Sequence, residues 1–340
     1  MGEVALRFLQ GGLEGSKGTA QTATRVLMAR ITNAGFNKPR EFVEEDRGTL
    51  VAAQRFIGGV KDYGFTIEGD ATYEQLGWFL ATTVIGSVSP TTINTTGYRF
   101  TYTPQTTAGG DTLQAATVEF GDDTQEYECE YCEGTRLTLG FDTLTVGQAT
   151  PVRFSADYFT QSLSSNTKTA GLTPPTVDTI LATGANFYLG ATSTAFASLA
   201  ELTGSLRSLN LTYDNQLARK VYVGDGDTFS NLGRGRRIIT FDAEVEGDSN
   251  GVTRFVEWDL GTQKRARIRF QGTEITGSSP STTKKLQIDM RFVLTSFDPL
   301  GAVDTNTTYR LSGRCLPDRA LSDAEVQFLI DQGLEAAAYT

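Results

Sequence analysis

The sequence predicts a mainly β protein of two antiparallel β-sandwich or half-barrel domains, with one or two short flanking helices. Apolar and polar residues alternate at period two in several segments, and this spacing places one set on one face of a strand. Clusters of Gly, Asn and Asp, such as residues 247–251, separate these segments as turns. Short strands with one polar face each are typical of a sandwich or barrel.

The strands follow this alternation along the chain. The clearest alternating set is Leu286, Ile288, Met290, Phe292 and Leu294. Strands are also predicted over residues 63–67, 137–141, 209–213 and 239–245. Each half of the chain therefore supplies strands for a sheet.

Two capping boxes predict helices. Thr72 and Gln75 precede Leu76, Phe79 and Leu80 at helical spacing, so a helix of about 13 residues is expected there. A second box, residues 322–325, predicts a short helix near the C-terminus, with Val326, Leu329 and Ile330 on one face.

A weak repeat and a linker suggest the domain organisation. Residues 160–178 are rich in Ser, Thr and Pro, which is typical of a linker. Residues 115–123 and 136–142 resemble 208–216 and 237–242, at an offset of about 93–100 residues. The predicted organisation is an N-terminal arm (1–35), a β domain (36–162), a linker (163–185), a second β domain (186–300) and a C-terminal arm with a short helix (301–340).

Composition argues against several classes of function. The chain has no histidine, which is the commonest general base near neutral pH and the commonest metal ligand. Its net charge of −10 disfavours tight binding to nucleic acid. No signal peptide or membrane-spanning segment is expected, because no apolar run is long enough. We therefore expect no catalysis, cofactor or metal.

The three cysteines give no recognisable site. Cys129 and Cys132 form a CxxC pair, but a structural zinc site needs four ligands and only Cys315 remains. On a strand these two positions point to opposite faces, so a disulfide would need a bulge. Buried thiols in a sheet are the expectation.

Two charged stripes are candidate surfaces. Glu126, Glu128 and Glu130 alternate with uncharged residues, and so do Arg265, Arg267 and Arg269. Each stripe is either a solvated face or a contact surface, the acidic one toward a pore or partner and the basic one toward a second subunit. Paired carboxylates for glycosidase chemistry are a further reading of the acidic stripe.

Several segments together resemble the tail tube proteins (major tail proteins) of long-tailed, siphovirus-type bacteriophages. They are RFIGGVKDYGFTIEGD, TYEQLGWFLATTVIG, YRFTYTPQ and VRFSADYF in the first half. In the second half they are LRSLNLTYDNQLARKVYVGDGDTF, IITFDAEVEG, RIRFQGTEI and LQIDMRFVLTSFDP. The resemblance covers residues 35–300 and lies in the order and spacing of the segments.

The resemblance implies a structural subunit of a virion tail, made in the host cytoplasm. Sheets of neighbouring copies would close a β-barrel, and rings would stack into a tube that conducts DNA during genome ejection. A duplicated tube domain implies a trimeric ring. The tail tip, tape measure and tail terminator proteins would be further partners, without membrane contact. Thr72, Leu76, Phe79 and Leu80 would form an inter-ring helix, and Glu126, Glu128 and Glu130 would contribute to an acidic lumen that repels phosphate.

Two other classes remain open. A secreted or cell-surface β-sandwich that binds carbohydrate would favour a signal peptide and clustered loop aromatics, and neither is found. An esterase or glycosidase would need a histidine, a G-x-S-x-G elbow or two carboxylates set apart in a cleft.

Overall fold

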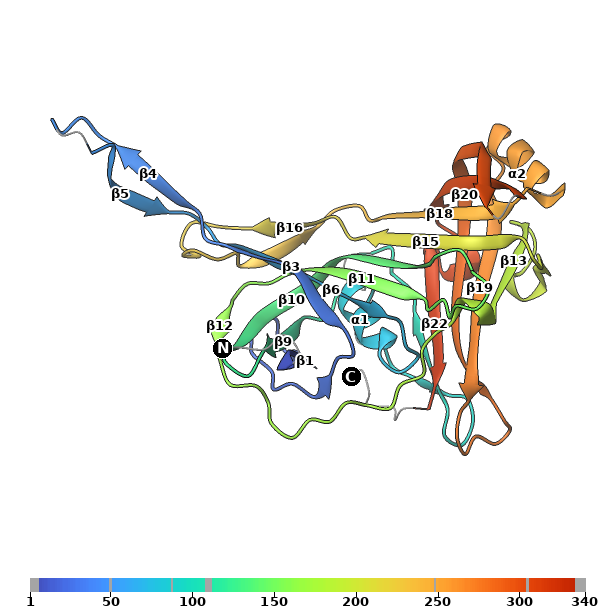
Figure 1. Ribbon diagram of the computed structural model, residues 1–340, viewed down its shortest axis with the longest axis horizontal. Coiled ribbons are helices and arrows are strands. Elements are labelled where there is room, and N and C mark those ends of the chain that lie inside the picture. The colour runs from blue at the N-terminus through green and yellow to red at the C-terminus, as the bar shows by residue number, and fades with distance from the viewer. Residues whose placement is uncertain are drawn as a thin grey trace.

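The chain folds mainly into antiparallel β structure, as the sequence predicts (Figure 1). The computed structural model describes residues 6–48, 51–86, 88–107, 112–247, 249–303 and 306–333. Two α-helices accompany the strands in these ranges, α1 (Leu76–Thr83) and α2 (Ser249–Asp259).

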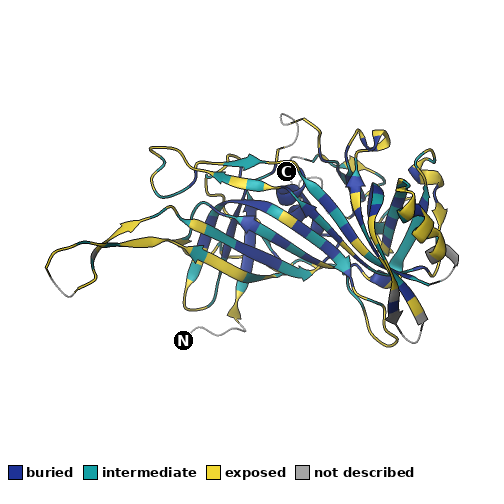
Figure 2. Ribbon diagram, turned by 90° about the horizontal axis from the view of Figure 1, so that it is seen from above, coloured by how far each residue is buried: buried dark blue, intermediate teal, exposed yellow. Residues whose placement is uncertain are grey.

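One continuous sheet of eight strands organises the molecule. Its order is β3-β6-β11-β10-β15-β18-β21-β20. The bounds are β3 Arg30–Asn37, β6 Asp62–Asp70, β11 Arg153–Phe159, β10 Glu126–Phe141, β15 Leu206–Asp214, β18 Ile238–Glu246, β21 Asn306–Leu316 and β20 Thr283–Val303. Apolar side chains alternate to one face of this sheet, where they are buried, and polar ones to the other (Figure 2).

Smaller groups of strands join the N-terminal halves of the two longest strands. Residues 126–132 of β10 pair with β9 (Ala116–Gly121), which pairs with β1 (Phe8–Leu13), and then β2 (Arg25–Val26). Residues 283–292 of β20 pair with β19 (Lys264–Glu274), and residues 285–290 also pair with β22 (Val326–Gln332). Shorter pairings add β7 (Thr91–Thr92), β8 (Tyr98–Tyr102), β12 (Ser164–Ser165), β13 (Ala185–Ala191) and β14 (Ala200–Glu201).

Both helices pack on the apolar face of the eight-strand sheet. All eight residues of α1 are buried, and the ring of Phe79 lies 4.2 Å from that of Phe154 on β11. Trp258 of α2 stacks on Phe297 of β20, with ring centroids 6.3 Å apart. Aromatic packing of this kind contributes through the area it removes from water.

The eight strands form two units with the same internal order. β3-β6-β11-β10 (unit 1) is followed by β15-β18-β21-β20 (unit 2). A hairpin joins the first two strands of each unit, β4 (Arg40–Glu44) with β5 (Ala53–Gly58) in unit 1, and β16 (Leu217–Lys220) with β17 (Asn231–Arg234) in unit 2. A helix then follows the second strand of each unit, α1 or α2. The duplication is therefore a repeat of topology.

A β-bulge marks equivalent positions of the two units. The pairing with the neighbouring strand shifts at Thr135 in β10 and at Thr295 in β20. Thr135 Oγ1 donates to the carbonyl of Asp157 at 3.1 Å, and Thr295 Oγ1 donates to that of Ser312 at 3.2 Å. The two acceptors occupy corresponding places in β11 and β21. Bulges are specific features rather than accidents of a sheet, so this match supports a true repeat.

The structure corrects the predicted repeat and the predicted arms. β6 and β18 begin at Asp62 and Ile238, so the structural offset is 176 residues and not about 93–100. The short sequence matches aligned β9 with β15 and β10 with β18. These strands do not occupy equivalent places, because β9 lies outside the eight-strand sheet and β10 is at the end of unit 1, whereas β15 and β18 are the first two strands of unit 2. β3 begins within the segment predicted as an arm over 1–35, and β21 lies within the one predicted over 301–340, yet each is a strand of the eight-strand sheet.

Both predicted helices also need correction. The first is shorter than expected at eight residues, and Gln75 does not cap it: its side chain donates to the carbonyl of Val26 and accepts from the amide of Met28, both at 2.9 Å. The second is the strand β22, in which Val326, Phe328 and Ile330 are buried at period two. Pairing with β20 and β8 on both sides favours the strand there.

The sheet remains open in the single chain. Among the described residues, no series of strand pairings returns to its starting strand. The chain alone therefore does not complete a barrel.

Candidate assembly and lumen surfaces

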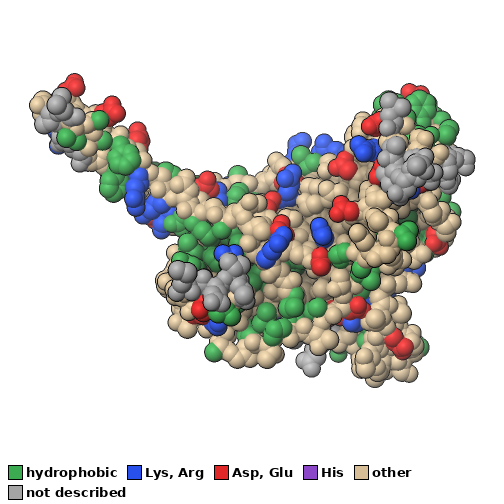
Figure 3. Space-filling model, in the orientation of Figure 1, with side chains coloured by type: hydrophobic (Ala, Val, Ile, Leu, Met, Phe, Trp, Pro, Cys, Tyr) green, Lys and Arg blue, Asp and Glu red, His purple; other side chains and the backbone are tan. Residues whose placement is uncertain are grey.

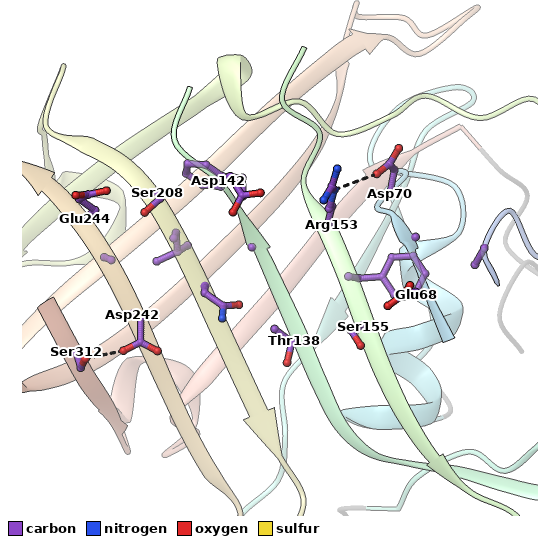
Figure 4. A pocket seen from close by; sticks show the side chains of 18 of the residues that line it. Glu68, Asp70, Thr138, Asp142, Arg153, Ser155, Ser208, Asp242, Glu244 and Ser312 are labelled. Carbon is purple, nitrogen blue, oxygen red and sulfur yellow. Dashed lines mark hydrogen bonds and ion pairs between the residues drawn. The ribbon is translucent and has the colours of Figure 1, made fainter. Parts of the chain in front are cut away.

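The polar face of the eight-strand sheet forms a broad hollow of about 960 Å³ (Figure 4). Successive strands each place one or two polar side chains in it. Its charged residues are five carboxylates and three arginines, Glu68, Asp70, Asp142, Asp242, Glu244, Arg30, Arg153 and Arg310. Carboxylates therefore outnumber cations on this surface.

Acidic residues recur at equivalent positions of the two units. At the offset of 176, Glu68 corresponds to Glu244 and Asp70 to Glu246. Asp70 is well exposed, whereas Glu244 is mostly buried and accepts a hydrogen bond from Thr308 Oγ1 at 2.6 Å. Two acidic positions of this face therefore recur in both units.

The sheet has a free edge at each end. Among the described residues, β3 pairs only with β6, so its other side is unpaired there. β19 pairs with residues 283–292 of β20, and β21 is the one strand that pairs with residues 293–303 in the described part of the chain. Free edges present unsatisfied N–H and C=O groups and are templates for pairing with another chain.

The β16–β17 hairpin of unit 2 docks on unit 1 of the same chain. Arg219 forms an ion pair with Asp62, and its guanidinium lies 3.7 Å from the ring centroid of Phe159. Leu232, on the paired strand, packs against Tyr131 and Phe229, whose rings are 5.5 Å apart. Burial is the largest influence on the pKa of Arg219 and lowers it.

The β4–β5 hairpin of unit 1 extends away from the body with apolar side chains on its surface (Figures 1 and 3). Phe42 and Phe56 face each other across the hairpin and are 65% and 56% exposed. A second exposed apolar strip lies on and after α2, at Val252, Phe255, Val256 and Leu260. No role is predicted from the sequence for either surface, although the segment RFIGGVKDYGFTIEGD includes residues 55–58 of β5.

The predicted acidic stripe lies against the linker. Lys168 pairs with Glu126, Asn166 Nδ2 donates to Glu128 at 2.9 Å, and Glu128 is buried. Burial, followed by repulsion from neighbouring carboxylates, raises the pKa of Glu130. The positive φ of Tyr131 interrupts the alternation here. In this chain, therefore, the carboxylates of Glu126 and Glu128 hold the linker, and the three residues do not form an open face.

The predicted basic stripe has partners within the chain. Arg265 forms two hydrogen bonds with Asp318 and Arg267 two with Asp289, all between 2.6 and 2.8 Å. The guanidinium of Arg269 lies over the ring of Tyr188 at 5.4 Å. These arginines join β19 to β20, β13 and the turn after β21. Their charged groups therefore already have partners within the chain.

The predicted inter-ring helix is interior. Leu76, Phe79 and Leu80 are at most 1% exposed, and Thr72 lies in a β-bridge with Thr179. The helix fills the core of unit 1, so it offers no surface to another ring.

The cysteines are buried thiols, as expected. Burial raises the pKa of Cys132 well above its usual value, which disfavours the reactive thiolate. In the described ranges no cluster of Asp, Glu or Cys side chains is placed to hold a metal ion.

Comparison with known proteins adds no family. No protein-family model matches the chain, and no curated protein matches it. Among the residues that the structure describes, neither helix has the length and apolar character needed to cross a membrane.

Proposed function

We propose that the chain is the structural subunit of a bacteriophage tail tube, and that three copies close a ring around a DNA channel. The observation that carries this proposal is the eight-strand sheet of two equivalent units, with one polar face and a free edge at each end. Joining β3 of one copy to β20 of the next would pair both edges and leave no free template for aggregation.

The dimensions suit this role. Three copies would supply about 24 strands, spaced about 4.8 Å apart and tilted by about 40°. The barrel would then have a backbone diameter of about 48 Å, which leaves room for a DNA duplex inside the side-chain layer.

The polar face supplies a suitable lining. The two apolar-face helices, α1 and α2, would lie outside the barrel, and the hollow of Figure 4 would face the channel. The repeated acids would give a ring of three chains a pseudo-sixfold arrangement of carboxylates. Such a lining repels phosphate and lets DNA pass without binding.

The rest of the proposal follows from the resemblance. The subunit would act without catalysis or cofactor, in the virion tail, with the tail tip, tape measure and tail terminator proteins as neighbours and DNA only in transit. Its main partner is a second copy of itself.

Cysteine crosslinking tests the proposed edge pairing. Arg136 and Asp214 face each other where β10 meets β15 within the chain. The equivalent residues of the β20–β3 junction are Ser296 and Asn37, because Asn37 pairs with Asp62 as Asp214 pairs with Ile238. Directly opposed residues have Cβ atoms about 4.5–5.5 Å apart. The double variant Asn37→Cys with Ser296→Cys, treated with a short bismaleimide, should give covalent dimers and trimers, with the ladder ending at the trimer.

Controls fix the interpretation. The pair Arg136→Cys with Asp214→Cys should crosslink within one chain and run as a monomer, and each of Asn37→Cys and Ser296→Cys alone should give no ladder. The three native cysteines are buried and will not compete. Only monomers from the double variant, at concentrations where the protein assembles, would contradict the proposed junction.

A further inference from the structure

We propose that the β4–β5 hairpin binds a second copy of this chain, at the surface of unit 2 that contains Ile238 and Arg314. The docking of β16–β17 on unit 1 is the internal template for this contact. The inference rests on the proposed function, because it places unit 2 of one copy beside unit 1 of the next.

The two hairpins correspond strand by strand. β5 and β17 end at Gly58 and Arg234, and Phe56 is likewise 176 residues before Leu232. Leu232 faces Arg219 across its hairpin, and Phe56 faces Phe42 across the other. Phe42 and Phe56 therefore take the places of the two residues that dock within the chain.

The two receiving surfaces correspond as well. Asp62 and Ile238 are the first residues of β6 and β18. Phe159 pairs with Gly64 and Arg314 pairs with Thr240, again at the offset of 176 on the receiving strand. In place of Asp62 and Phe159, unit 2 thus presents Ile238 and Arg314.

Both contacts pair a guanidinium with an aromatic ring, but the two groups exchange places between hairpin and body. Within the chain, a guanidinium on the hairpin (Arg219) lies over an aromatic ring on the body (Phe159). Between copies, an aromatic ring on the hairpin (Phe42) would meet a guanidinium on the body (Arg314). Asp62, which pairs with Arg219 within the chain, corresponds to the apolar Ile238 in unit 2. This fits the hairpin of unit 1, which has Phe42 and not a cation at the position of Arg219.

The exposure of these residues fits an unfilled contact. Phe42 and Phe56 are the two most exposed phenylalanines among the described residues, and Arg314 is also exposed. A two-stranded hairpin that stands alone in water is marginally stable, so its shape is expected to depend on a partner (Figure 1).

A second copy is the occupant that the fold favours. The hairpin grows from the β3 end of the sheet, and its target lies on β18 and β21 toward the β20 end. A contact between two different ends of one molecule is heterologous and repeats from copy to copy until a ring closes. The β4–β5 hairpin of one copy would contact the same neighbouring copy whose β20 pairs with its β3.

Photocrosslinking tests the position of the hairpin. The full-length protein carrying p-benzoylphenylalanine at Phe42, irradiated after assembly, should form covalent dimers whose crosslinked peptides contain residues 238–242 or 312–316. The same probe at Tyr222, which is 58% exposed on the other hairpin, should not reach these peptides in a second copy. Crosslinking only within one chain, or to an unrelated protein, would overturn the proposal.

An exchange of side chains tests the chemistry. Phe42→Arg would place two guanidinium groups together and should weaken self-association about 10-fold, whereas Phe42→Arg with Arg314→Phe restores the in-chain arrangement and should recover it. All variants should melt like the parent as monomers, because Phe42 lies on the hairpin outside the core and Arg314 is exposed on β21. If Phe42→Arg assembles as well as the parent, this contact is excluded, while the ring can still form through β3 and β20. If the parent protein itself forms no rings, the proposed function is excluded instead.

Discussion

Replacing Asp331 by alanine should destabilise the fold by about 3–5 kcal/mol. The side chain of Asp331 is 2% exposed on β22, and its two oxygens accept hydrogen bonds from Arg99 of β8 at 2.7 and 2.8 Å. Lys285 of β20 lies 2.8 Å from the same carboxylate. Hydrogen bonding to Asp331 raises the pKa of Arg99, so removing the carboxylate leaves two partly buried cations without their shared anion.

Urea unfolding of the monomer measures this loss. The matched control is Asp70→Ala, which removes an exposed carboxylate 3.9 Å from Arg153 and should cost less than about 1 kcal/mol. Replacing Asp331, Arg99 and Lys285 together by apolar residues should recover most of the stability, because no buried charge then remains. Similar losses for Asp331→Ala and Asp70→Ala would show that the buried network is not what holds β22 in place.

Reversing the charge of the proposed lumen should make assembled tubes retain DNA. Glu68→Lys, Asp70→Lys and Asp242→Lys together raise the charge of each chain by about six, all on the polar face of the sheet. The expected result is nuclease-protected DNA that sediments with the tubes, lost steeply as salt rises, because binding depends on counterion release. Parent tubes should protect no DNA.

The control carries the same charge on other surfaces. Glu201→Lys, Glu274→Lys and Asp259→Lys are exposed and lie outside the eight-strand sheet. DNA that this variant binds should remain accessible to nuclease. Equal protection by the two variants would contradict the assignment of the polar face to the channel.

Alternation in the sequence predicted five strands of the eight-strand sheet, β6, β10, β15, β18 and β20. Leu286 to Leu294 and Ile239 to Val245 have the predicted period, because each strand has one buried and one polar face. The same rule failed near the C-terminus, where Val326, Leu329 and Ile330 fit a helix while Val326, Phe328 and Ile330 fit a strand. Only pairing with β20 and β8 decides between them.

Surfaces were harder to predict than strands, because local sequence does not show what covers a residue. The stripe of Glu126, Glu128 and Glu130 has the spacing of an open face, but the linker folds back over it. Helix α2 begins within residues 247–251, which resemble a turn, although Val252, Phe255 and Val256 carry a helical spacing. The free edges of β3 and β20 depend on the order of strands far apart in the chain.

Imaging of the assembled protein by cryo-electron microscopy tests the central proposal most directly. We predict rings of three chains with pseudo-sixfold symmetry, β3 of each copy paired with β20 of the next, and Glu68, Asp70 and Asp242 facing a central channel. Rings whose channel is lined by the apolar-face helices, or a protein that stays monomeric at high concentration, would contradict it.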